Sequence, residues 1–175
     1  MVGEIIAGFL KNLLIVLFGV AIITAIAKVA RGGSARDTAS ISYVLWGEVL
    51  FYAVGIGFIY TGLLHAYAQN IVAPSIGWTP SPFEYELGWM EIPLGGVAMM
   101  SLWRGYEFRL AATIVFSVFV LEAAVQHIQQ ILCCQNYAPG NAGVFIWVGD
   151  IVLPIVLLIA AALSRRNLRL GAVQR

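Results

Sequence analysis

The stretch that decides the fold is Trp78-Thr-Pro-Ser-Pro-Phe-Glu-Tyr-Glu-Leu-Gly-Trp-Met-Glu91. It combines a helix start with several carboxylates, and the segment that continues from it is apolar enough to lie in a membrane. Carboxylates are costly inside a bilayer, so a membrane segment that keeps several of them calls for a functional interpretation. The carboxylates of this stretch are Glu84, Glu86 and Glu91.

The chain as a whole is far more apolar than a soluble domain. Of its 175 residues, 61% are hydrophobic and 11% are charged, whereas a soluble domain carries roughly 25% charged residues. The apolar residues lie in long runs, which predicts an all-α integral membrane protein with the lipid bilayer as its partner. The formal net charge is only +1 and there is no basic patch outside the loop ends, so no nucleic-acid partner is expected.

Five transmembrane helices are predicted, forming a single membrane domain over residues 1–175. At a rise of 1.5 Å per residue, about 20 residues suffice to cross a hydrocarbon core of roughly 30 Å. The connection from Gln69 to Pro80 is uncharged and is expected to be irregular. The predicted helices cover residues 4–29, 41–68, 82–103, 107–132 and 142–163.

Capping residues mark two of the helix starts. Ser81 at the N-cap, Pro82 at the first helical position and Glu84 at the third form the pattern of a capping box. Further along, Pro139-Gly140-Asn141 breaks the chain. Asn141 is the expected N-cap of the last helix, since asparagine is favoured at that position.

The basic residues determine the predicted orientation. They follow the first helix, separate the third from the fourth, and follow the fifth, while the connections 69–81 and 133–141 contain none. Basic residues accumulate on the cytoplasmic side of a membrane protein. The N-terminus is therefore predicted outside and the C-terminus in the cytoplasm, across the inner (plasma) membrane. The residues on the cytoplasmic side are Lys28, Arg31, Arg36, Arg104, Arg109, Arg165, Arg166, Arg169 and Arg175.

With this orientation, polar residues of four different helices fall in the outer half of the bilayer. Glu91 and Asp150 each lie about 13 Å from the outer end of their helix, and Glu122 lies near the midplane. Such residues are expected to face a common cavity that binds or conducts a cation or a proton. The predicted site comprises the acids Glu91, Glu122 and Asp150, His127 and Glu86 at the mouth, and Lys11 as the counter-charge.

Two prolines strengthen the prediction of a cation site. Pro154 removes the hydrogen bond that the carbonyl of Asp150 would accept, and Pro93 does the same for the carbonyl of Trp89. A free carbonyl beside a carboxylate is an oxygen-rich position for a cation. The alternative is that both prolines only kink their helices, and that the buried acids pair with Lys11 or with glutamines.

A metal or haem site is an alternative interpretation of the same residues. Glu91, Glu122, His127 and Asp150 are candidate metal ligands. His65 and His127 lie toward the outer side on different helices, which is compatible with a bis-histidine haem in a membrane redox protein. The five-residue spacing from Glu122 to His127 differs from the Glu-x-x-His spacing of di-iron bundles and counts against that class. The sequence assigns no enzymatic activity.

A third interpretation is a non-catalytic accessory or assembly subunit, in a homo-oligomer or a larger membrane complex. In that case the polar residues only hold helices together. A packing seam is expected in any case, because Gly55 and Gly62 share one stripe of the second helix and Gly88 and Gly95 share one stripe of the third.

The cysteines carry no predicted chemistry. Cys133 and Cys134 are adjacent at the end of a predicted helix. Neighbouring cysteines rarely bond to each other, because a disulfide prefers Cα atoms further apart than one peptide unit allows. Two buried free thiols are therefore expected.

The stretch Ser81-Pro-Phe-Glu-Tyr-Glu-Leu-Gly88, together with His127 and the turn Ala138-Pro-Gly-Asn-Ala-Gly143, resembles a family of small prokaryotic integral membrane proteins of unknown function. The likeness covers about the second to the fifth helix. It implies no activity, and implies only that the 78–91 stretch and the 138–143 turn belong together on the outer face.

Overall fold

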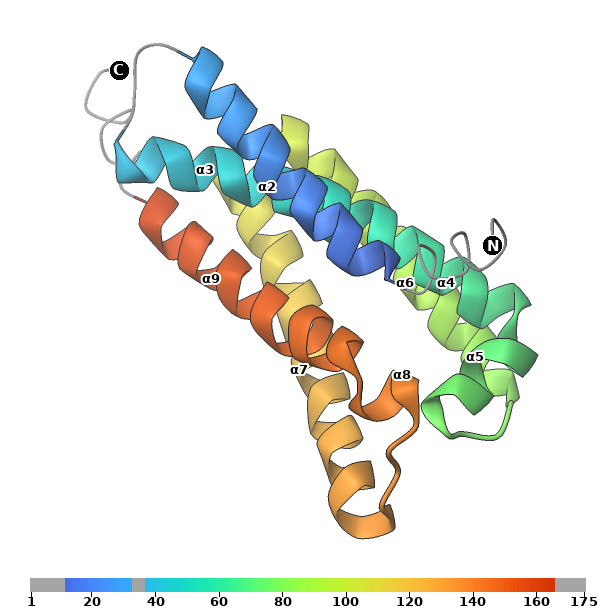
Figure 1. Ribbon diagram of the computed structural model, residues 1–175. Helices are drawn as coiled ribbons and strands as arrows, with labels where there is room; N and C mark the ends of the chain where they lie inside the picture. The colour runs from blue at the N-terminus through green and yellow to red at the C-terminus, as the bar shows by residue number, and fades with distance from the viewer. Residues whose placement is uncertain (1–11, 33–36, 166–175) are drawn as a thin grey trace, which may run out of the picture.

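A computed structural model describes residues 12–32 and 37–165 of the chain. Within these two ranges every regular element is a helix (Figure 1). The elements are α2 (Leu13–Arg31), α3 (Thr38–Val49), the π-helix η1 (Leu50–Ile56), α4 (Gly57–Tyr67), α5 (Gln69–Ile76), α6 (Pro82–Met100), the 3-10 helix η2 (Ser101–Trp103), α7 (Tyr106–Cys134), α8 (Pro139–Ala142), the π-helix η3 (Ile146–Val152) and α9 (Leu153–Ser164).

Four helical stretches of the described residues are long and apolar enough to cross a membrane. They are Leu13–Arg31, Thr38–Tyr67, Tyr106–Cys134 and Pro139–Ser164. These agree with four of the predicted helices. The fifth predicted helix is present as α6, but its carboxylates exclude it from this set, which is defined by length and composition alone.

The predicted helix start is confirmed, with Ser81 at the N-cap and Pro82 at the first helical position, but the predicted capping box and the predicted N-cap at Asn141 are wrong. Ser81 does occupy the N-cap of α6, but its side chain makes no cap hydrogen bond, and the Glu84 side chain contacts His65 instead. Asn141 lies inside the short helix α8, whose N-cap is Ala138. In both cases the side chain that the local capping pattern would use bonds instead to a residue of another helix.

The connection between the second and third predicted helices is also more regular than expected. Residues Gln69–Ile76 form α5, and Gly77 ends this helix with a left-handed conformation, φ +81°. Glycine adopts this conformation without steric cost, as is common at helix C-termini. The chain then reaches Ser81 through an extended segment and turns into α6.

A glycine seam joins α6 to the long helix formed by α3, η1 and α4. A Cβ on Gly88 would lie 2.4 Å from the carbonyl oxygen of Gly62, and a Cβ on Gly95 would lie 2.6 Å from that of Gly55. The two glycine stripes therefore face each other and bring the two backbones into direct contact, as small residues do between membrane helices.

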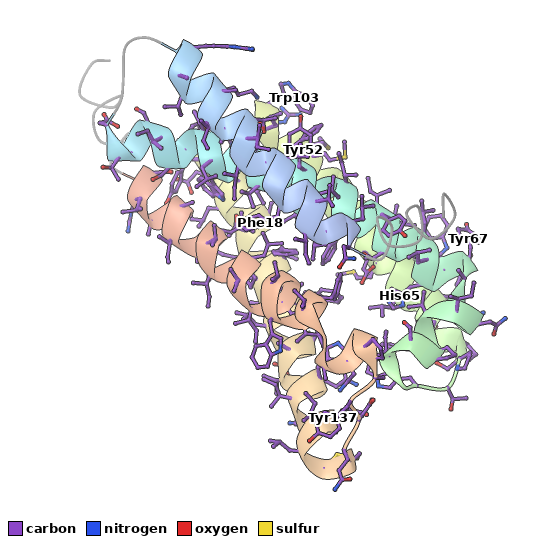
Figure 2. The ribbon with its side chains drawn as sticks, in the orientation of Figure 1. Phe18, Tyr52, His65, Tyr67, Trp103 and Tyr137 are labelled. Carbon is purple, nitrogen blue, oxygen red and sulfur yellow. A yellow bond between two sulfur atoms is a disulfide. The ribbon has the colours of Figure 1, made fainter. Side chains whose placement is uncertain are left out.

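The basic end of the molecule consists of the ends of α2, α6 and α9 and the starts of α3 and α7. Arg109 is buried there and donates hydrogen bonds to the carbonyls of Ser101, Tyr43 and Leu102. The Tyr106 hydroxyl donates to the carbonyl of Ala161. These bonds tie α7 to three neighbours at one end. Trp103 lies near this end, and His65 and Tyr67 lie toward the opposite end of the same helical body (Figure 2).

The apolar core lies between the basic end and the middle of the bundle. Trp46 is fully buried and donates from its indole nitrogen to the Thr113 hydroxyl, 2.8 Å away. Leu50, Phe116 and Leu157 pack around the same region. Beyond this core the C-terminal half of α7 extends away from α4 and α6, and α5 and α8 meet across the space between them (Figure 1). Because α7 diverges from α4 and α6, a cavity lies between them.

Candidate functional site

A cavity of about 1490 Å³ occupies the space between the α4–α6 pair and the C-terminal half of α7. The start of α2 and the segment from α8 to η3 complete its wall. At the far end, Asn136 donates a hydrogen bond to the carbonyl of Ile76, and Gly140 lies against the carbonyl of Ser75. The loop after α7 and the helices α5 and α8 are therefore joined at this end.

Four of the predicted site residues line this single cavity. They come from three separate elements: Glu91 from α6, Glu122 and His127 from α7, and Asp150 from η3. Their proximity to one space was expected from their depth along the helices. Their role in binding a ligand remains a prediction.

Glu91 and Asp150 are the buried acids of the cavity. Their residues are 7% and 6% exposed. Oε2 of Glu91 has no hydrogen-bond partner within the described residues. Thr61 and His65 are polar neighbours of the Glu91 carboxyl, and the charges of Glu91 and Asp150 act on each other. Burying a carboxylate oxygen that has no hydrogen-bond partner costs free energy. This position is therefore suited to a positively charged ligand.

Asp150 lies in a π-helix, a feature that the sequence prediction did not contain. Residues Ile146–Val152 form η3, and Pro154 is the second residue of α9 directly after it. Proline cannot donate to a carbonyl four residues earlier, and its ring clashes with that carbonyl. A wider turn relieves the clash, and single π-turns inside helices are frequent at functional sites. By contrast, Pro93 lies inside α6, which the structure keeps in the α conformation.

A buried pair formed by His65 and Glu84 lies beside the acids. Nδ1 of His65 is 2.5 Å from Oε2 of Glu84, whose side chain is 4% exposed. Glu84 is thus a partner of the histidine and not the capping residue that its spacing from Ser81 predicted. The carboxylate accepts the Nδ1 proton, which leaves Nε2 as the second nitrogen of a ring that lines the cavity.

His127 is held in place by Asn141, a residue that was predicted to be a helix N-cap. Nδ1 of His127 is 2.7 Å from Oδ1 of Asn141, which is fully buried. The Asn141 amide nitrogen donates to the carbonyls of His127 and Asn136, so its oxygen must be the acceptor. Nδ1 of His127 therefore carries the proton, and this bond fixes the ring as outer hydrogen bonds fix functional histidines.

The Trp78 ring covers one face of the His127 ring. The two rings are stacked with centroids 5.7 Å apart and planes 14° from parallel. Nε1 of Trp78 is buried without a hydrogen-bond partner among the described residues. Trp78 begins the stretch 78–91 but had no predicted role. Its contact with His127, which lies 49 positions further along the chain, indicates a role for Trp78.

Glu122 and Glu86, two other acids of the predicted site, are more exposed than Glu91 and Asp150. Glu122 lines the cavity but is exposed, whereas Glu86 is exposed and is not a lining residue. Lys11 lies outside the described residues. Within residues 12–32 and 37–165, no three side chains of the types His, Cys, Asp and Glu are grouped closely enough to hold a metal ion. The candidate metal ligands therefore share a cavity without forming a coordination shell.

The prediction for the cysteines is wrong. Cys133 and Cys134 are joined in a disulfide at the end of α7, and both residues are exposed. The next residue, Gln135, ends the helix with φ +52°. The free, buried thiols expected from the sequence are thus absent from this helix end, because the chain leaves the bundle here.

Glu48, a buried acid away from the cavity, has a partner. Glu48 is 2% exposed, and Lys28 Nζ lies 2.5 Å from its Oε1. The ammonium group itself is largely exposed, so the pair connects the interior to the surface of the basic end. This pairing explains Glu48 without a functional role.

The helical architecture and the apolar stretches define the class of protein. A chain of helices, four of which are able to cross a membrane, fits a multi-pass membrane protein in contact with a lipid bilayer. The chain belongs to a family of unknown function, DUF6790, whose match covers residues 11–169. None of the curated proteins or solved structures compared with the chain matches it.

Proposed function

We propose that the chain is a five-span membrane bundle in which α6 is the fifth span. α6 has 19 residues and is about 28 Å long, close to the hydrocarbon thickness. It runs antiparallel to the helix formed by α3, η1 and α4, which has 30 residues. Glu84 meets His65 at one end of this pair, and Trp103 meets Phe51 toward the other.

The proposed orientation has the cavity on the outside and the basic end in the cytoplasm. Among the described residues, Lys and Arg occur only toward the basic end. The cavity lining contains no Lys or Arg in the part of the chain that the structure describes. This separation of charge supports an N-terminus outside the inner (plasma) membrane and a C-terminus in the cytoplasm.

The function that this geometry supports best is the binding of a cation in the cavity. The observation that carries the proposal is the partnerless Oε2 of Glu91, buried in a wall that also holds Asp150. Two acids act on each other there, and the described lining supplies no lysine or arginine to neutralise them. A bound cation would neutralise the pair, and a proton shared between the two acids is the smallest such cation.

The test is cation-dependent stabilisation of the full-length protein in detergent. The ligands are Na⁺, K⁺, Ca²⁺, Zn²⁺ and the organic cation tetraphenylphosphonium, each added as the chloride. At least one of them is expected to raise the unfolding temperature of the wild type, since a ligand that binds only the native state stabilises it. The rise should be lost in Glu91→Gln and Asp150→Asn. Glu107→Gln, an exposed acid at the basic end, is the control that should keep it.

Two results contradict cation binding. One is an unfolding temperature that none of these cations changes, provided that the protein gives a single cooperative transition. The other is a rise of equal size in the wild type and in both acid variants, because the site would then lie elsewhere.

Haem binding is a second candidate function, favoured by the two histidines. His65 and His127 line the same cavity, and each has Nδ1 engaged by an oxygen acceptor. A histidine held in this way presents Nε2 for an iron ligand. Reconstitution of the purified protein with haemin should then give a low-spin absorption spectrum that disappears in both His65→Ala and His127→Ala. A high-spin or unchanged free-haem spectrum in the wild type contradicts this function.

A further inference from the structure

We infer that the ligand of the cavity is an organic cation with an apolar body, which rests on the proposed function and specifies its substrate class. Three properties of the cavity point to this class: its size, its aromatic wall and the sparse arrangement of its acids.

The cavity is too large for an inorganic ion. Its volume of about 1490 Å³ exceeds the roughly 300–1,000 Å³ of common small-molecule sites. A bare metal ion would fill a small fraction of this space and would need water to complete its coordination. A molecule with an apolar body displaces that water from the walls, and the displacement itself favours binding.

Six aromatic side chains contribute to the wall of the cavity that also holds the acids. Rings attract cations through their negatively charged faces, and they also bury the apolar parts of a ligand. They are contributed by α4, α6 and α7, by the segment before α6 and by the segment between α8 and η3, so a ligand in the cavity would be enclosed from several sides. The aromatic lining residues are Phe58, Tyr60, Trp78, Phe83, Phe119 and Phe145.

The acids supply charge without a coordination shell. Calcium takes six to eight oxygen ligands and structural zinc takes four side-chain ligands, but the described residues hold no group of three candidate ligands. One partnerless carboxylate oxygen on Glu91, with Asp150 as a neighbouring charge, suits a single ammonium or phosphonium centre. Such a centre needs charge compensation and aromatic contact and no ordered ligand set.

The stacked pair of Trp78 and His127 adds a polar contact for the body of the ligand. Nε1 of Trp78 is a buried donor without a partner in the described chain, and His127 presents Nε2 at the same wall. A donor and an acceptor at one place would recognise a hydroxyl, ether or amide group on an otherwise apolar molecule.

The experiment measures equilibrium binding of radiolabelled tetraphenylphosphonium to the detergent-purified full-length protein. We expect saturable binding that weakens at least about tenfold in Glu91→Gln, because the buried charge partner is lost. Phe119→Leu keeps an apolar side chain and removes a ring, so it should weaken binding about threefold. Glu107→Gln should bind like the wild type.

Competitors separate the possible outcomes. Triphenylphosphine oxide is a neutral analogue of similar shape and should not displace the label. If it displaces the label as well as unlabelled tetraphenylphosphonium does, the cavity takes apolar molecules or lipid regardless of charge, and the inference is wrong. If tetraphenylphosphonium fails to bind while Na⁺, K⁺, Ca²⁺ or Zn²⁺ stabilises the protein through Glu91, the proposed cation site stands and the organic class falls. If no cation binds, both fall.

Discussion

At the scale of single residues, the site is built from pairs that join different helices. His65 of α4 holds Glu84 of α6, and Asn141 of α8 holds His127 of α7. In each pair the side chain that bonds to the histidine is buried, at 3% exposure for Glu84 and 0% for Asn141. The polar bonds thus orient the rings and also connect the elements that enclose the cavity.

The His65–Glu84 pair gives a prediction about stability. Replacing His65 by Ala leaves a buried carboxylate without its partner, which costs about 3–5 kcal/mol when a buried pair is broken from one side. The double variant His65→Ala/Glu84→Leu removes the stranded charge and should recover most of this loss. Thermal unfolding in detergent measures both variants. Equal losses in the single and the double variant would show that Glu84 does not depend on His65.

Single residues also show how far the sequence predicts the site. Glu91, Glu122, His127 and Asp150 line one cavity. Counting residues along regular helices predicted only that all four lie in the outer half of the bilayer. The partners could not be predicted in this way. Glu84 fits a local capping pattern, and its preference for His65 depends on which faces of α4 and α6 meet.

At the scale of elements, the glycine stripes of α6 and of the continuous helix η1–α4 determine how closely the two helices approach. The stripes were visible in the sequence as Gly55 and Gly62 on one helix and Gly88 and Gly95 on the other. The structure places them against each other, and a backbone carbonyl oxygen is the nearest neighbour of Gly62, Gly88 and Gly95. Because the His65–Glu84 pair and Glu91 lie on these same two helices, the seam also positions the acidic wall of the cavity.

Two glycines of α6 give a matched test of this seam. A Cβ on Gly88 would lie 2.4 Å from the carbonyl oxygen of Gly62, whereas a Cβ on Gly96 meets no atom within 4 Å. Gly88→Ala should cost about 1–3 kcal/mol, as overpacking does. Gly96→Ala should be neutral or stabilise α6 by up to about 1 kcal/mol, since alanine favours helices. Equal unfolding temperatures for the two variants would contradict direct backbone contact at the seam.

The elements that the sequence did not predict are those that depend on strain or on distant contacts. α5 forms in a stretch with few apolar repeats, and it is fixed at its end by Asn136 from the far side of the cavity. The π-helix around Asp150 accommodates Pro154, whose effect on the Asp150 carbonyl was predicted but whose structural consequence was not. A proline indicates a disturbed helix, and the surrounding packing decides whether the helix bends or widens.

At the scale of the whole molecule, the described basic residues lie at one end and the cavity at the other. Lys28, Arg104, Arg109 and Arg165 belong to the basic end, and the buried acids Glu91 and Asp150 line the cavity beyond the apolar core. In the proposed orientation this axis crosses the bilayer, the core lies in the hydrocarbon and the cavity opens to the outer side. The proposal rests on the distribution of Lys and Arg, because the cavity would face the cytoplasm if the basic end faced outward.

The position of α6 decides between this topology and one with four spans. In a background with Cys133→Ser and Cys134→Ser, single cysteines are introduced as Thr79→Cys before α6 and Gly105→Cys after it. Both positions are exposed, and a Cβ at Gly105 meets no atom within 4 Å. On sealed, right-side-out membranes, an impermeant maleimide should label Thr79→Cys at once and Gly105→Cys only after permeabilisation. Labelling of both from the same side means that α6 does not cross. The reverse pattern means that α6 crosses and the basic end faces outward, against the usual distribution of Lys and Arg.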